Sequence, residues 1–552
     1  MAADGANGAA ADGGPHSLES LGRGSLLSFV GQFLNLAILF GMRVELVHFL
    51  SVQQFGVLIL GVSLFYILIA VLNLGVPTAV TRQIAHTRDP AERRAVMRVS
   101  VWLMLLMALL VPLVLIPTAG FWAGLAHNGQ FVPVLQLLSI YLSVTLFIYL
   151  LAAFFQGHED MLPNMLFMQF LGPLLTLGFL AAFFVLGLGL NGAVLSYVLG
   201  GSLALGLLAI YTLRRRRELL DGPGGRWPGE DPISRGNARA LLAFSLPLAL
   251  VGLATAAPGN ADTLVVGVLQ PVQVAGSYNA ALALGRLVGL GITSLAFIML
   301  PVAARLHARG DMVELRRSYA TITKWILLLS VPFFILFLFF PFEALTFLYG
   351  SKVSSPAYAQ AATVLIIVSL GGLIASLLGP AVAVLTAMGR LAPLVRATVI
   401  SATVDVGGSF LLVPIWGPVG AAVAFAAATT ILPAICLIEI NTRAVVHPFT
   451  LALAKPLLAV ALVFGILFGS LKLALHYSPS FFAVPVLFLA VAGGYLVAVP
   501  ATRSIEAEDG HLLTVVEGYL GRRLYALRAL GKHFVRSSPA DTGPLPVERG
   551  GP

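Results

Sequence analysis

Four charged residues stand out in this sequence because each lies within a long apolar run: Arg43, Arg286, Asp262 and Asp405. A charged side chain inside such a run is costly, so each of the four is a candidate for function. The two guanidinium groups can pair bidentately with the oxygens of a phosphate. The two carboxylates can accept a proton or a sodium ion, or can neutralise the arginines. The residue types therefore indicate anion binding with charge balance or ion coupling nearby.

Amide side chains accompany these charges. Asn279 lies seven residues before Arg286, so the two share a face two helical turns apart. Amides can hydrogen-bond hydroxyl groups, although asparagines in membrane helices more often connect neighbouring helices. The candidates for binding hydroxyl groups are Asn35, Asn73, Asn260 and Asn279.

Each charged candidate also has a structural alternative. Arg43 and Glu45 lie near the outer end of the first run and can form a local pair at the membrane interface. Arg286 can serve as the charge partner of Asp262 or of Asp405. Asp405 lies about ten residues from the outer end of its run, where water can reach it.

Other chemistries lack the residues that they need. Gly187-x-Gly189-x-x-Gly192 matches a dinucleotide fingerprint only formally, because no soluble strand precedes it. The longest internal polar loop, about 214–238, has no acidic constellation of the kind that a glycosyltransferase presents, and the sequence contains no P-loop. Cys436 is the single cysteine, which excludes an intrachain disulfide. We therefore predict no enzyme activity, no catalytic residue, no metal site and no cofactor.

The composition identifies the elements that position these residues. Apolar residues make up 58% of the chain and charged residues only 10%, against about 25% charged in soluble domains. The apolar residues form runs long enough to cross a bilayer, and in lipid such runs must be helices. The sequence thus predicts an all-α integral membrane protein with kinks at Pro112, Pro247, Pro258 and Pro332. Its fourteen predicted spans are 24–49, 55–81, 95–118, 131–156, 163–186, 191–213, 239–268, 275–304, 319–342, 357–388, 391–413, 418–442, 451–474 and 480–500.

The net charge of +9 is explained by topology. Arginines cluster in the loops near 82–98, 214–239 and 305–317, which alternate with loops that contain little Lys or Arg. By the positive-inside rule, both termini are predicted to be cytoplasmic, and nucleic-acid binding is not expected. Residues 1–22 are predicted to be disordered. The segment 511–536 is predicted to be a basic amphipathic helix, either on the anionic membrane surface or solvated without a specific role.

An internal repeat divides the chain into two similar blocks. Residues 77–94 read PTAVTRQIAHTRDPAERR, and about 220 residues later 301–317 read PVAARLHARGDMVELRR. Upstream, Gln54-Phe55-Gly56 matches Gln273-Val274-Ala275-Gly276. Before the last helix of each block, 187–193 (GLGLNGA) matches 415–422 (IWGPVGAA). Blocks of six spans share one orientation, so a pseudo-twofold axis along the membrane normal is expected, as in many secondary transporters.

The runs FGVLILGVSLFYILIAVLNLGVPTAVTRQIA, LLAFSLPLALVGLATAAPGNADTLVVGVL and PIWGPVGAAVA resemble those of the polysaccharide-biosynthesis flippases. These belong to the multidrug/oligosaccharidyl-lipid/polysaccharide exporter superfamily. The resemblance implies two six-helix lobes around a central cavity, plus an added C-terminal helix pair. The expected division is an N-terminal tail 1–22, an N-lobe 23–213, a cytoplasmic linker 214–238, a C-lobe 239–443, the helix pair 444–500 and a cytoplasmic tail 501–552.

The function that this resemblance implies is translocation of a lipid-linked glycan across the cytoplasmic membrane by alternating access. Arg286 and Arg43 would hold the phosphate or pyrophosphate, the asparagines would contact sugar hydroxyls, and Asp262 and Asp405 would serve H⁺ or Na⁺ coupling. Membrane lipids and glycan-assembly enzymes are the further partners expected. The alternative is a cation-coupled exporter of drugs or metabolites with the same core. It is less favoured because spans two to six contain no acidic residue.

Overall fold

The computed structural model describes residues 31, 34–86, 90–215, 245, 249–444, 446–449, 464–466 and 468–470. The predicted spans thirteen and fourteen fall almost wholly outside the described residues. The predicted terminal segments 1–22 and 511–536, and nearly all of the linker 214–238, lie outside them as well. The described part is helical throughout and contains no strand. The predicted all-α class is therefore confirmed.

The first lobe begins with a helix over residues 34–49. Ser51 then caps the second helix, because its side chain accepts from the backbone of Gln54 while Gln54 reaches back to the backbone of Ser51. The helices that follow are α2 (Val52–Leu72), α3 (Val76–His86), α4 (Pro90–Leu125), α5 (Phe131–Gly157), the π-helix η1 (Asn164–Leu171), α6 (Gly172–Val185) and α7 (Gly189–Arg214).

The second lobe repeats this pattern with more interruptions. A helix over Ala249–Ala256 bends by 56° into α10 (Ala261–Leu269). The remaining elements are α11 (Val272–Gly285), the 3-10 helix η2 (Arg286–Gly289), α12 (Leu290–Ala308), α13 (Met312–Phe339), α14 (Pro341–Tyr349), η3 (Gly350–Ser354), η4 (Pro356–Tyr358), α15 (Ala361–Leu378), α16 (Ala381–Ala387), α17 (Leu391–Trp416) and α18 (Pro418–Ala444).

Ten helices of the described part are long and apolar enough to cross a membrane, and the bent pair makes an eleventh span. The predicted kink at Pro258 is confirmed by that bend. Pro112 and Pro332 lie inside the continuous helices α4 and α13, and Pro247 lies outside the described residues. The predicted span 357–388 was wrong as a single helix. It is divided at Gly379, whose φ of +65° belongs to the left-handed region that favours glycine.

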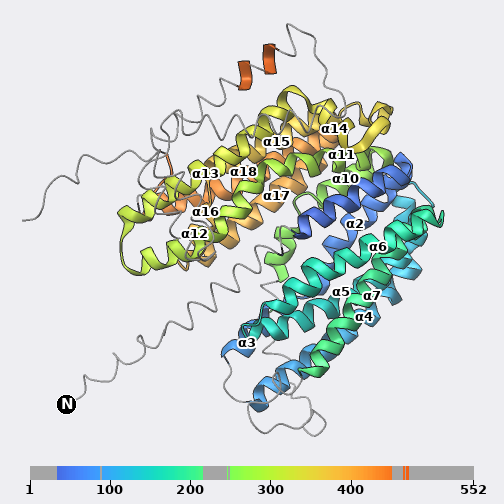
Figure 1. The fold of residues 1–552 in the computed structure, drawn as a ribbon, viewed down its shortest axis with the longest axis horizontal. Coiled ribbons are helices and arrows are strands. Elements are labelled where there is room, and N and C mark those ends of the chain that lie inside the picture. The colour runs from blue at the N-terminus through green and yellow to red at the C-terminus, as the bar shows by residue number, and fades with distance from the viewer. Residues whose placement is uncertain are drawn as a thin grey trace, which may run out of the picture.

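The two lobes lie side by side and approach each other most closely at one end, where α2 and α11 meet (Figure 1). A Cβ on Gly276 would lie 3.0 Å from the Cα of Gly56, and a Cβ on Gly56 would lie 2.1 Å from the carbonyl oxygen of Val272. These two glycines are equivalent positions in the sequence repeat. Their direct contact is consistent with a pseudo-twofold axis between the lobes.

Lys352 adds a second connection between the lobes at this end. Its ammonium group, which η3 carries, donates to the backbone carbonyls of Val47, His48 and Leu50, and the contact with His48 spans 3.1 Å. Burial lowers the pKa of this ammonium group, and the carbonyls at the end of the first helix compensate for the water that it loses. The end joined in this way is opposite the end that carries the arginine-rich loops.

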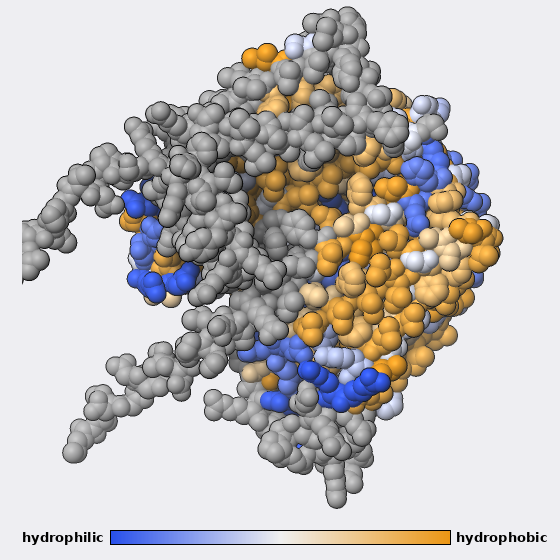
Figure 2. Space-filling model, viewed as in Figure 1, coloured by the Kyte–Doolittle hydropathy of each residue, from blue (hydrophilic) through white to orange (hydrophobic). Residues whose placement is uncertain are grey.

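The outer flank of the N-lobe is apolar. Figure 2 shows a broad hydrophobic surface there, with hydrophilic residues gathered toward the ends of the helices. Leu109 and Leu113 of α4 are 63% and 71% exposed, which in water would leave a large apolar surface uncovered. This surface is suited to contact lipid, and the chain is a multi-pass membrane protein.

Candidate functional site

Asp262 lies fully buried at the start of α10, directly after the bend in its span. Its carboxylate accepts two hydrogen bonds, from the hydroxyl of Tyr278 at 2.5 Å and from the backbone N–H of Thr263 at 2.7 Å. Gly259 has a φ of +83°, which allows the chain to turn from one half of the span into the other. The break thus places a carboxylate at the N-terminus of a half-helix, where the helix dipole favours negative charge.

Asp405 lies on α17 and is also fully buried. Neither of its carboxylate oxygens has a hydrogen-bond partner among the described residues, and the same is true of Ser409 Oγ and Asn279 Oδ1. Buried oxygens without partners are rare in folded proteins, because each costs free energy of desolvation that no bond offsets. Asp405 interacts electrostatically with Asp262 and Arg286, which places these three residues in one cluster.

Arg286 directly follows α11 and begins η2, and it is exposed although it lies in the middle of a membrane span. One guanidinium nitrogen donates to the carbonyl of Pro258 at 3.1 Å, and the group lies 5.3 Å from the ring centre of Phe425. A side chain at Gly259 would overlap the guanidinium, so this glycine leaves the space that Arg286 occupies. Arg286 forms no ion pair with either aspartate within the described part of the chain. Its guanidinium therefore keeps donors available.

Arg43 connects the lobes instead of pairing locally. Its guanidinium donates to the backbone carbonyl of Asn279 at 3.3 Å and also interacts with the hydroxyl of Tyr349. Glu45 does not pair with it, and one carboxylate oxygen of Glu45 is buried without a partner among the described residues. The structure thus brings Arg43 from the N-lobe to the cluster that the C-lobe provides.

The four asparagines all make hydrogen bonds that stabilise the fold. Asn279 donates to Thr263 Oγ1 at 3.3 Å within the cluster, and Asn260 donates to the carbonyl of Ala256 at 2.8 Å across the bend. Asn35 donates to the carbonyl of Gln169 at 2.9 Å and so ties the first helix to η1. Asn73 ends α2 and accepts from the backbone of Gly75 at 2.8 Å. Of the four, Asn260 precedes Asp262 by two residues, and Asn279 contacts Thr263 within the charged cluster.

Sequence reasoning missed a group of tyrosines on the N-lobe. Tyr66 is 42% exposed and lies within electrostatic range of both Arg43 and Arg286. Tyr141 stacks on Phe65 with ring centres 4.8 Å apart and meets Tyr197 edge-on at 5.7 Å. The sequence signal for these tyrosines was the position of a phenol well inside an apolar run, because its hydroxyl needs a polar partner there.

The arrangement is suited to bind an anion. Two guanidinium groups, one from each lobe, interact electrostatically with one another, and Tyr66 and the buried carboxylates of Asp262 and Asp405 lie within range of them. The positive groups can hold phosphate oxygens, and the carboxylates can balance charge or take up a cation.

Comparisons with known proteins agree with this reading of the fold. A family model described as polysaccharide biosynthesis protein matches residues 21–307, and a second, described as MatE, matches residues 247–411. No curated protein sequence matches the chain.

Three solved structures illustrate the similarity. The lipid II flippase MurJ in its inward closed conformation has a TM-score of 0.67 at 13% identity, covering 86% of this chain and 98% of its own. An inward-facing multidrug resistance MATE transporter of the MOP superfamily has a TM-score of 0.62 at 17% identity, covering 79% and 99%. An outward-facing MATE structure gives 0.57 at 17% identity, covering 78% and 99%. At these identities the likeness establishes the shared fold.

Proposed function

Since this chain belongs to the polysaccharide biosynthesis protein family, we propose that it is a flippase that moves a lipid-linked glycan across the cytoplasmic membrane. One structure of the same fold is that of a lipid II flippase. The observation that carries the proposal is Arg286, an exposed guanidinium in the middle of a membrane span with no acidic partner within 4 Å among the described residues. An isoprenoid phosphate or pyrophosphate supplies the anion that such a group needs.

The substrate cavity would lie between the lobes. Arg43 and Arg286 would hold the phosphate, and Tyr66 and its neighbours would provide the surface for the sugars. Asn260 and Asn279 would contribute hydroxyl contacts from the C-lobe, whereas Asn35 and Asn73 would stabilise the N-lobe helices. The isoprenoid chain would remain in lipid. With the arginine-rich loops in the cytoplasm, the described conformation faces inward, because the lobes are joined at the opposite end.

Transport can be measured directly in proteoliposomes that contain a fluorescent isoprenoid-pyrophosphate disaccharide. The expected result is protein-dependent movement of the label to the opposite leaflet, read as protection from an impermeant quencher. Ion-driven efflux of a soluble organic cation, with no movement of the lipid-linked sugar, would contradict the proposal. That outcome would favour the cation-coupled exporter, which the match to the MatE model and the buried aspartates also suit.

Coupling to H⁺ or Na⁺ is assigned to Asp262 and Asp405. Asp405→Asn keeps the shape of the side chain and removes its charge. We therefore expect the variant to lose any stimulation of transport by an imposed sodium or proton gradient.

If sodium is the ion, NaCl should raise the thermal unfolding temperature of the parent protein above its value in choline chloride, and should not do so for Asp405→Asn. Asp160→Asn is the matched control, since Asp160 forms a surface ion pair with Arg215 at 3.3 Å. Gradient stimulation that persists in Asp405→Asn would leave Asp405 a role in charge balance only.

A further inference from the structure

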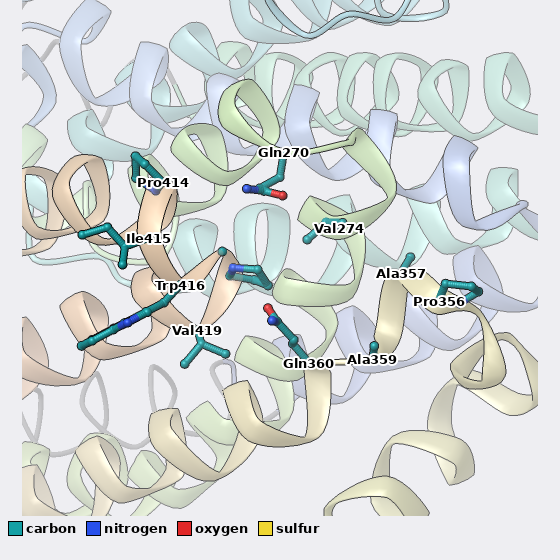
Figure 3. Close-up of a pocket in the computed structure, with 12 residues that line it drawn as sticks. Gln270, Val274, Pro356, Ala357, Ala359, Gln360, Pro414, Ile415, Trp416 and Val419 are labelled. Atoms are coloured by element: carbon teal, nitrogen blue, oxygen red, sulfur yellow. The ribbon is translucent and has the colours of Figure 1, made fainter.

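A large pocket lies on the C-lobe at the end where the two lobes are joined. It is an open depression with a volume of about 840 Å³, bordered by the turn between α10 and α11, the short helix η4 and the turn between α17 and α18. Figure 3 shows Gln270 and Gln360 on two sides of this pocket and Trp416 on its flank. The volume lies in the range of small-molecule sites, about 300–1,000 Å³. None of the residues that sequence reasoning assigned to the site lines it.

The lining is uncharged and mostly apolar, with two amide side chains. None of its twelve residues carries a charge, and prolines, alanines and aliphatic side chains provide most of its apolar surface, with Trp416 at its edge. The amides of Gln270 and Gln360 have no hydrogen-bond partner among the described residues, and each can donate two hydrogen bonds and accept others. A phosphate-bearing headgroup would need a cation that this lining lacks. A neutral ligand with many hydroxyl groups and apolar ring faces matches all of these features.

We propose that this pocket is a second glycan site, which binds neutral sugar units on the side of the membrane to which the substrate is delivered. The proposal rests on the proposed function for the identity of the glycan and for the direction of delivery. Binding of a saccharide by the pocket itself does not depend on either.

The turn that forms one wall is one of the repeated sequence motifs. Gly417 has a φ of +60°, and a Cβ there would lie 3.1 Å from the side-chain oxygen of Gln360. Glycine therefore both permits the turn and leaves room for the amide. The motif recurs in both halves of the chain, but none of its residues belongs to the charged cluster described above.

Two helices connect this pocket with the charged cluster. Gln270 follows Asp262 by eight residues along α10, about 12 Å, and Pro414 follows Asp405 by nine residues along α17, about 14 Å. Ser277, next to Tyr278 of the cluster, donates to the carbonyl of Ala357 in η4 at 2.6 Å. The pocket and the cluster are therefore separate sites on shared helices.

Trp416 provides the readout for a binding test. The chain has five tryptophans, so replacing Trp102, Trp122, Trp227 and Trp325 with phenylalanine leaves a full-length protein that reports from the pocket alone. In nanodiscs, cellobiose and N,N′-diacetylchitobiose are titrated while Trp416 emission is recorded. The expected result is a saturable change for at least one disaccharide, with a dissociation constant on the order of 1 mM.

The variants then locate the binding. Gln270→Ala combined with Gln360→Ala is expected to weaken it at least tenfold, whereas Gln156→Ala, at the far end of α5 in the other lobe, should leave it unchanged. A protein whose one tryptophan is Trp102 should show no saturable change. The absence of saturation with both disaccharides, or binding that survives in the double variant, would contradict the proposal that this pocket binds sugar units. Because translocation is assayed separately, failure of the flippase proposal and failure of this one give different results.

Discussion

Arg286→Gln is expected to lower translocation of a lipid-linked pyrophosphate substrate by roughly 10- to 150-fold. Hydrogen bonds to charged groups contribute about 1.5–3 kcal/mol each, and about 1.4 kcal/mol corresponds to a factor of ten. The guanidinium has one hydrogen bond to a carbonyl and no ion pair among the described residues, so its remaining donors are free for the phosphate. The loss should appear in both substrate affinity and transport rate, measured in proteoliposomes at several substrate concentrations.

Two further variants separate binding from structure. Arg286→Lys keeps the charge but not the bidentate geometry, so an intermediate loss is expected. Arg396→Gln changes an exposed arginine of the same lobe and should transport as the parent does. A stabilising role would instead give Arg286→Gln a lower thermal unfolding temperature and an unchanged transport rate per folded molecule. That combination would remove Arg286 from the proposed site.

The fold was predictable from the sequence to the extent that it follows from hydrophobicity and repetition. Apolar runs in lipid can satisfy their backbone only as helices, which predicts the helices on both sides of the loop near 305–317. The repeat predicted an axis, and the contact between Gly56 and Gly276 is consistent with it. Interruptions within runs were harder to predict. Gly379 and Pro380 divide a stretch that is apolar throughout, so the signal for this break is a Gly-Pro dipeptide and not polarity.

The candidate site was predictable in residue type but not in partnership. The cost of charge in lipid identified Asp262, Asp405 and Arg286, yet a sequence cannot say which of them form pairs. The hydroxyl of Tyr278 donates a hydrogen bond to the carboxylate of Asp262, a carboxylate for which Arg286 was a candidate partner. Chain proximity offered Glu45 as an alternative partner of Arg43, whereas the fold brings Arg43 to the carbonyl of Asn279, 236 positions away. Such contacts depend on how the lobes dock, which local spacing does not encode.

The docking of the lobes rests on a contact that leaves no room for a side chain. At Gly56 a Cβ would lie 2.1 Å from the carbonyl oxygen of Val272 and 2.8 Å from its carbonyl carbon, and backbone atoms cannot rotate away. Gly56→Ala should therefore penalise the conformation in which the lobes are joined at this end by about 1–3 kcal/mol, as overpacking does elsewhere. Its population relative to the opposite conformation should fall roughly 5- to 150-fold. Transport should slow, because alternating access must pass through both conformations.

Distances between spin labels can test this shift. Replacing Cys436 with serine removes the single cysteine, after which cysteines at His127 and Ala359 label the joined end and cysteines at Glu159 and Arg309 label the opposite end. Gly56→Ala should lengthen the first distance and shorten the second. Gly178→Ala, where a Cβ would meet nothing within 4 Å, should change neither. Lys352→Met should shift the same distances in the same direction, since it removes the hydrogen bonds from the ammonium group to the carbonyls of the first helix. Unchanged distances in Gly56→Ala would mean that the two glycines do not control how the lobes close.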